Sequence, residues 1–358
     1  GYAKVARLQF IANHTPALSE WVYLQLLEVL RTETLDTERY RQTHQLLAEP
    51  TPLGNHPPSG GDHGSYQTPP PLDEAWIRTT EQSNRTAIDR LEAELGDHRH
   101  EMNRAGIYAS SWALADQLYR MGKARGALKL YLRTRDFCSS IPESIKLQLR
   151  IIDLAVLLQE WGIAGAQMSK LRSITQGSFP VESDEDHFQA VAGIGHLRTR
   201  NYLEAAQHFS RMQTDPDQFV SQVISPLDIA TYTTMCALAT YNRDELKGLI
   251  YNSPRFKHYL ELDPALPQIL EAFYSCQFRE GFELLKTQKA LLQLDMFMSG
   301  LLDSVETILR KAMLHRYIKP LNTISIPTMA TAFGVTPAFM ESTLFRLITQ
   351  DNMDAEID

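Results

Sequence analysis

Residues 325–348, SIPTMATAFGVTPAFMESTLFRLI, decide the fold of the C-terminal part of the chain. Each half carries apolar residues at helical spacing, namely Ile326, Met329, Ala330 and Phe333, then Met340, Leu344, Leu347 and Ile348. Ser325 and Thr336 are suited to cap the two helices, and Pro327 and Pro337 fit their first turns because proline has no N–H to leave unsatisfied. Gly334 permits a sharp turn between them. The stretch therefore predicts a helix-turn-helix.

The residues just before this stretch, 322–326, are predicted to supply the first strand of a winged helix.

The charge of the module does not suit nucleic acid. From residue 319 onward the only basic side chains are Lys319 and Arg346, and the acidic ones are Glu341, Asp351, Asp354, Glu356 and Asp358. Neutralising phosphates requires several Lys or Arg at one site. We therefore predict that the module binds protein, and a winged-helix nucleic-acid-binding protein is the alternative of another class.

The overall composition agrees with a protein-binding role. The chain has 358 residues, 43% of them hydrophobic, and a net charge of −8, which disfavours general binding to nucleic acid or anionic membranes. No apolar run approaches the roughly 20 residues of a membrane-spanning helix, and no signal-peptide pattern opens the chain. Cys138, Cys236 and Cys276 are too sparse for disulfides or a zinc site, which indicates a reducing compartment. The start at Gly1 and the abrupt end at Asp358 lead us to expect that both native ends lie outside this sequence.

The middle of the chain shows a helical repeat. Two sets of residues share the same offsets, Gly122, Ala127 and Tyr131 in one and Arg200, Ala205 and Phe209 in the other. Small residues where helices cross, followed by an aromatic residue one turn later, are typical of tetratricopeptide-like hairpins. Residues 147–158 are apolar on nearly every side, so this helix must be covered on two faces, as inside a stacked solenoid.

Residues 50–71 interrupt the helices with seven prolines and four glycines, and we expect a mobile loop there. The predicted fold is all-α, a tetratricopeptide-like solenoid followed by a truncated winged-helix module. The predicted domains are N-terminal helices at 1–102, a repeat array at 103–290, and a module at 291–358 that ends at the wing.

No catalytic, cofactor-binding or metal-binding residue is predicted. His98 and His100 resemble the His-x-His pair of a metalloprotease, but the positions of the expected Ser and of the third ligand hold Tyr108 and Ser111. A catalytic zinc needs three protein ligands, so a metal-dependent peptidase is only an alternative. The acidic run Asp184–Asp186 fits favourable charge at a helix N-terminus.

Two basic patches have two possible interpretations. They are Arg198, Arg200 and Arg211 around one hairpin, and Lys123, Arg125 and Lys129 around another. A solvated face is the default interpretation, and a docking surface for an acidic partner is the alternative.

Five segments carry a resemblance to a known family. They are RLQFIA at 7–12, LDEAW at 72–76, ALKLYLRTRDFC at 127–138, CALATYNRDEL at 236–246 and FKHYLELDP at 256–264. With these segments the chain resembles the subunit-one family of the COP-nine signalosome, a branch of the PCI-domain proteins, over nearly its whole length. The paralogous proteasome-lid family shares the architecture and matches 236–246 less well.

The resemblance implies a non-catalytic scaffold subunit in the complex that removes the ubiquitin-like modifier NEDD-eight from cullin ubiquitin ligases. It implies other PCI-type subunits and cullin-RING ligase components as partners, no cofactor, and a location in cytoplasm and nucleus. It also implies that a different subunit carries the metalloprotease motif, and that the rest of the wing and a long C-terminal helix follow residue 358. A proteasome-lid PCI subunit remains the alternative.

Four apolar residues are predicted to contact partners. Ile324, Ile326 and Ile357 would lie on the exposed edge of the wing, because unpaired strand edges recruit further strands. Phe345 and its neighbour Phe339 lie off the main apolar stripe of the last helix. Core packing against the sheet is the favoured interpretation for both, and exposed partner contact is the alternative.

Overall fold

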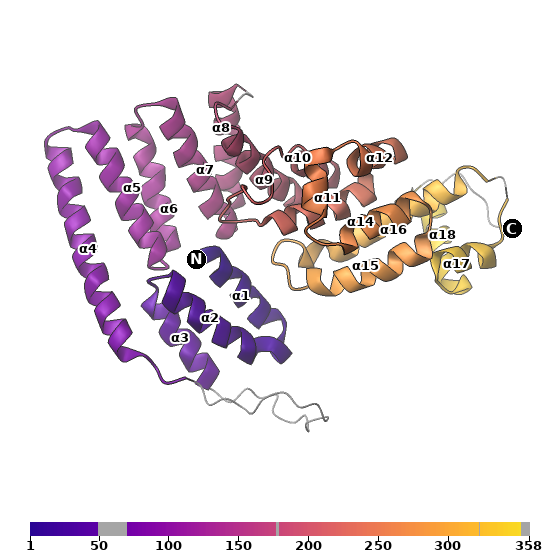
Figure 1. Cartoon of the computed structure of the whole chain (residues 1–358), viewed down its shortest axis with the longest axis horizontal. Coiled ribbons are helices and arrows are strands. Elements are labelled where there is room, and N and C mark those ends of the chain that lie inside the picture. Colours follow the sequence, from indigo (N-terminus) through magenta and orange to yellow (C-terminus); the bar gives the residue numbers. More distant parts are fainter. Residues whose placement is uncertain (49–69, 177–178, 322, 352–358) are drawn as a thin grey trace. The chain divides into compact units, whose positions relative to one another are not determined.

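The computed structural model describes residues 1–48, 70–176, 179–321 and 323–351, and these residues form helices with no strand among them (Figure 1). The predicted all-α class is confirmed. The chain divides into two compact units, Gly1–Pro180 and Val181–Asp358. Most of the predicted 50–71 loop lies outside the described residues, and the predicted domain limits at 102 and 290 stay predictions.

The first unit is a row of helices in which sequence neighbours pack together. Its elements are α1 (Tyr2–His14), η1 (Pro16–Leu18), α2 (Ser19–Glu33), α3 (Thr37–Ala48), α4 (Glu74–His100), α5 (Arg104–Arg120), α6 (Ala124–Thr134), η2 (Arg135–Phe137), α7 (Ile141–Leu157) and α8 (Trp161–Thr175). Helix α7 is buried from Leu147 to Leu157 except at Arg150, which confirms the prediction that it is covered on more than one side.

Arg150 is the polar exception within that buried helix. Its guanidinium lies 4.5 Å from the centre of the Tyr119 ring and 5.9 Å from that of Tyr131. It also donates a 3.0 Å hydrogen bond to Asp116. Burial raises the pKa of the Tyr119 hydroxyl, so this ring stays neutral. The charge of Arg150 is therefore paired and stacked where α5, α6 and α7 meet.

The second unit continues the helical hairpins and ends in the helix-turn-helix. Its elements are α9 (Glu182–Arg198), α10 (Tyr202–Ser210), α11 (Pro226–Thr240), α12 (Arg243–Tyr251), α13 (Pro254–Leu260), α14 (Ala265–Tyr274), α15 (Phe278–Leu292), η3 (Ser299–Leu301), α16 (Leu302–Ile318), α17 (Ile326–Phe333) and α18 (Pro337–Asp351).

Five of the helix-to-helix turns share one geometry. A residue in the left-handed conformation follows the end of the first helix, and the second helix begins two residues after it. The residues in the left-handed conformation are Met102, Gly122, Gln159, Arg200 and Cys276. The next amide then donates to a carbonyl five residues back, as in Lys123 to Leu118 and Asn201 to His196, both at 2.9 Å. This is the Schellman arrangement, which satisfies carbonyls at a helix end.

The predicted repeat offsets correspond to equivalent structural positions. Gly122 and Arg200 both adopt the left-handed turn, with φ of 77° and 60°. The residues that follow them at the same offsets, Ala127 and Tyr131 in one repeat and Ala205 and Phe209 in the other, all have 0% exposure. The small residue lets the helices approach, and the aromatic ring fills the space beside the crossing.

Asp186 joins α9 to the loop that follows α10. Its carboxylate is 1% exposed and accepts hydrogen bonds from the amides of Gln213, at 3.0 Å, and Thr214, at 2.5 Å. The neighbouring Glu182, Asp184 and Glu185 lie in the first turn of α9, as the helix N-terminus prediction requires. Asp186 has a different role, because it holds a loop.

Replacing Gly193 by alanine is expected to destabilise the second unit by about 1–3 kcal/mol, since overpacking strains a filled core. A Cβ there would lie 2.4 Å from Cε1 of Phe209, whose ring is fully buried. Gly248→Ala is the control, because nothing lies within 4 Å of a Cβ at that helical position; it should stabilise by up to about 1 kcal/mol. Urea unfolding followed by circular dichroism measures both, and equal effects would contradict the packing argument.

Asp186→Ala is expected to lower the free energy of unfolding by about 2–4 kcal/mol, because it removes a buried carboxylate that accepts hydrogen bonds from two amides of the loop. Asp184→Ala removes a carboxylate from the same helix turn but no hydrogen bond to that loop, so it should cost less than about 1 kcal/mol. Chemical denaturation of the two variants compares them. Similar losses would show that Asp186 acts only through the charge at the helix end.

Candidate protein-interaction surface

The predicted helix-turn-helix is present as α17 and α18. The hydroxyl of Ser325 accepts from the amide of Thr328 at 3.3 Å, and that of Thr336 accepts from Phe339 at 3.3 Å. Gly334 ends α17 with φ of 64°, in the same left-handed turn that separates the earlier hairpins. Capping and turn residues therefore act here as their types predict.

The inner faces of both helices are packed as predicted. Met329, Ala330 and Phe333 of α17 are buried, and so are Met340, Leu344 and Leu347 of α18. The Phe333 ring stacks on Phe278 of α15 with centroids 4.7 Å apart, and it meets Tyr317 of α16 edge-on at 5.5 Å. These rings fix α17 to the preceding helices, since offset and edge contacts between aromatic residues are favourable.

The strand predicted at 322–326 is wrong at Ile326, which is the first residue of α17. Ser325 caps the helix and Pro327 fits its first turn, so local signals favour a helical start over an extended one. Half-buried Ile324 lies in an irregular segment, and the described residues 323–351 provide no strand for it to pair with. Ile357 lies outside the described residues. Partner contact by these isoleucines stays a prediction.

The favoured core interpretation of Phe339 and Phe345 is wrong. Their exposed fractions are 47% and 64%, because no sheet covers this side of α18 in the part of the chain that the structure describes. Residues 339, 342, 345, 346 and 349 follow helical spacing and form the exposed face of α18. Two large rings on one uncovered helix face are typical of an interaction site.

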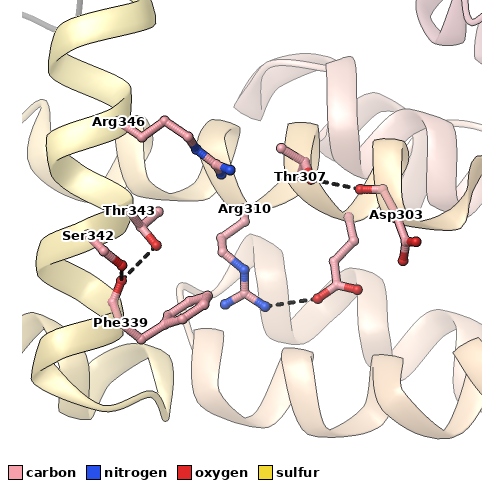
Figure 2. A pocket seen from close by; sticks show the side chains of 8 residues that line it. Asp303, Thr307, Arg310, Phe339, Ser342, Thr343 and Arg346 are labelled. Atoms are coloured by element: carbon pink, nitrogen blue, oxygen red, sulfur yellow. Dashed lines mark hydrogen bonds and ion pairs between the residues drawn. The ribbon is translucent and has the colours of Figure 1, made fainter.

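A groove of about 470 Å³ lies between α16 and α18. Four residues of each helix line it, Asp303, Glu306, Thr307 and Arg310 on α16 and Phe339, Ser342, Thr343 and Arg346 on α18. Figure 2 shows Arg346 reaching from α18 into the groove and the Phe339 ring beside the guanidinium of Arg310. The groove therefore adjoins the exposed face of α18.

Charged groups on the α16 side are held in place by their neighbours. Arg310 donates to Glu306 at 3.0 Å, and its guanidinium lies 4.4 Å from the Phe282 ring centre and 5.5 Å from that of Phe339. Lys289 donates to Glu306 at 2.7 Å. Burial acts to raise the pKa of Glu306, but hydrogen bonds from Lys289 and Arg310 outweigh it and lower that pKa. Glu306 is therefore ionised at neutral pH.

The remaining polar groups of the groove offer a partner hydrogen-bond acceptors and one cation, the guanidinium of Arg346. Thr307, Ser342 and Thr343 each donate their hydroxyl proton to a backbone carbonyl of their own helix, at 2.7–2.9 Å. Arg346 pairs with no carboxylate among the described residues. This site can hold an apolar side chain and a carboxylate of a partner, because it combines exposed rings with an accessible guanidinium.

His98 and His100, the pair considered for a metal, lie in the last turn of α4. The Nδ1 atom of His98 is buried without a hydrogen-bond partner, and its ring lies against Gly106. Within the described ranges no group of three His, Cys, Asp or Glu side chains could hold a metal ion. No described helix is long and apolar enough to cross a membrane.

Sequence reasoning missed the α16 wall of the groove. Asp303, Glu306 and Arg310 are spaced three and four residues apart, which places charges of both signs on one face of a helix. That spacing can be recognised in the sequence. The contacts of Arg310 with Phe282 and Phe339 cannot be predicted from it, because these residues are far apart in the chain.

Two family models match the chain. One is described as 26S proteasome subunit RPN7 and matches residues 73–249, and the other is the PCI domain and matches residues 285–358. The second match includes the groove and the helix-turn-helix. The first includes the helices from α4 to α11 and most of α12.

Two signalosome subunits match the chain over its full length. COP9 signalosome complex subunit 1b of Drosophila melanogaster is 26% identical over 100% of this chain and 75% of the relative. Subunit 1 of Arabidopsis thaliana is 26% identical over 100% of this chain and 78% of the relative. A 26S proteasome non-ATPase regulatory subunit 6 homolog of Arabidopsis thaliana is less similar, at 19% over 80% of this chain and 73% of the relative. The chain is therefore similar to subunit 1 of the COP9 signalosome over its whole length, and its residues 285–358 match the PCI domain.

Proposed function

We propose that this protein is a non-catalytic assembly subunit of a COP9-signalosome complex and that its C-terminal module holds other PCI-type subunits. The full-length similarity to signalosome subunit 1 proteins supports this proposal most strongly. The structure contributes a module whose surface suits protein binding, with exposed rings on α18 beside a charged groove.

The exposed face of α18 is the part of the module that we assign to partner contact. Phe345 and Phe339 would bury apolar area against a neighbouring subunit, and Arg346 would pair with a carboxylate at the rim. Ile324 and Ile326 lie at the start of α17 on the same module. Together with Ile357 they are proposed contacts with a neighbouring subunit. Ile324 and Ile357 would act from the edge of the wing, since exposed strand edges recruit further strands, and Ile326 would act from the first turn of α17.

The proposal extends to the reaction of the whole complex. A signalosome of this kind would remove the ubiquitin-like modifier from cullin-RING ubiquitin ligases, and ligase components would be further partners in cytoplasm and nucleus. Catalysis would belong to another subunit, in line with the interrupted His-x-His pattern at His98 and His100. Elemental analysis that found stoichiometric zinc in the purified chain would overturn this assignment.

A proteasome-lid subunit is the second candidate. The match of residues 73–249 to the RPN7 model favours it. The lower identity of the proteasome relative, 19% compared with 26%, weighs against it. Nucleic-acid binding has less support, because the sequence from residue 319 onward holds two basic residues and five acidic ones, and binding to phosphates requires several basic side chains.

The test is co-purification of the full-length chain with signalosome and proteasome-lid PCI subunits, expressed together in turn. We expect a stable complex with the signalosome set, and Phe345→Asp should weaken it by about 2–4 kcal/mol, because an apolar contact is lost and a charge is buried. Leu291→Asp is the matched control. Leu291 is 61% exposed on α15, outside the groove, and its replacement should leave the complex intact.

Three results would contradict the proposal. The chain could join only the proteasome set, or it could join neither. Phe345→Asp and Leu291→Asp could also have the same effect, which would show that assembly does not depend on the α18 face. Size-exclusion chromatography with mass determination distinguishes these results.

A further inference from the structure

Helix α6 in the first unit carries a stripe of basic residues that the proposed function does not use. From residue 123 to residue 135 the sequence KARGALKLYLRTR holds five basic side chains and no acidic one. This contrasts with the chain as a whole, in which 43 acidic residues outnumber 35 basic ones. The segment is therefore a local concentration of positive charge on an acidic protein.

The geometry of α6 gathers three of these charges on one exposed line. Arg125, Lys129 and Arg133 lie four residues apart, and all three side chains are exposed. The opposite face, which includes Ala127 and Tyr131, is fully buried against the neighbouring helices. Side chains four residues apart lie about 6 Å from each other on a helix surface, so the stripe runs about 12 Å along the axis.

Carboxylates of the same unit neutralise little of the charge on the stripe. The guanidinium of Arg125 lies 4.0 Å from the carboxylate of Glu160, and the Arg125 side chain is 80% exposed. Lys129 and Arg133 form no ion pair within the described residues of this unit. Like charges four residues apart destabilise a helix, so nothing in the packing of α6 accounts for this arrangement.

Two exposed arginines on α4 of the same unit are arranged differently. On α4, Arg78 pairs with Glu74 at 2.7 Å and Arg90 pairs with Glu94 at 3.5 Å, both across one helical turn. Those arginines belong to an ordinary solvated face whose charges are balanced locally. The α6 stripe is not balanced in this way, which favours the docking interpretation of this basic patch.

We propose that Arg125, Lys129 and Arg133 form a docking surface for an acidic segment of a partner protein. Carboxylates at intervals of about 6 Å would meet the three cations in register, as on a helix with acids at every fourth position. An extended acidic segment also fits, because alternate residues of a strand lie about 6.7 Å apart on one side. The proposal does not depend on the signalosome assignment.

The charge of the rest of the molecule favours protein over nucleic acid as the partner. A polyanion contacts a wide area and is repelled by the net charge of −8. An acidic protein segment needs to meet only the stripe. Three cations in a line suit such a segment better than a phosphate backbone, which requires many contacts for tight binding.

The test measures binding of labelled alanine-rich peptides to the full chain by fluorescence anisotropy at low and physiological salt. One peptide carries three glutamates at every fourth position, and an isomer carries them side by side. We expect the spaced peptide to bind more tightly, with an affinity that falls as salt rises. The triple variant R125E/K129E/R133E should bind it about ten-fold more weakly or worse, since each exposed pair contributes up to about 1 kcal/mol.

The matched control is R78E/R85E/R90E, which makes the same charge change on exposed positions of α4. It should change the affinity by less than about two-fold, and both triple variants should keep the helical circular dichroism signal of the parent chain. Equal loss in both variants would overturn the proposal, because only net charge would matter. Equal binding of the two peptides would also overturn it. So would a DNA duplex that binds more tightly than the spaced peptide and is released by the α6 substitutions. A dimer of this chain that forms only with the unsubstituted stripe would overturn it as well.

Discussion

The helical hairpins depend on a backbone constraint at their turns. A single residue in the left-handed conformation must end one helix so that the next can reverse direction within two residues. Glycine adopts this conformation freely, yet Met102, Gln159, Arg200 and Cys276 adopt it as well. L-residues enter this region at a cost of about 1 kcal/mol. The packing of the hairpins must therefore be strong enough to hold strained turns, and after Arg200 the buried Ala205 and Phe209 contribute to that packing.

The same turn also forms the C-terminal module. Gly334 joins α17 to α18 as Gly122 joins α5 to α6. The two sites differ in what surrounds the second helix. Helix α6 is packed on one side by α5 and α7, whereas the outer face of α18 keeps Phe339 and Phe345 exposed. One geometry thus serves both the solenoid and the surface assigned to partner binding.

Much of the fold could be predicted from the sequence because its signals are local. Caps at Ser325 and Thr336 and the repeated offsets of Gly122 and Arg200 are short-range features, and the structure confirms them. The exposure of Phe345 could not be predicted, because it depends on which elements cover α18. The strand prediction at Ile326 failed for a related reason, since a strand requires a partner that the sequence does not specify. Proximity of Arg310 to Phe282 and Phe339 is a long-range contact of the same kind.

The position of Arg310 has a mechanical consequence. A guanidinium lying over two rings, one on α15 and one on α18, connects these helices through a broad, shallow attraction. Interlocked aliphatic side chains resist sliding, because any shift opens voids. A flat charge over a flat ring tolerates small lateral displacement. At this corner α18 is therefore connected to α16 through a contact whose attraction changes little when the ring and the guanidinium shift slightly against each other.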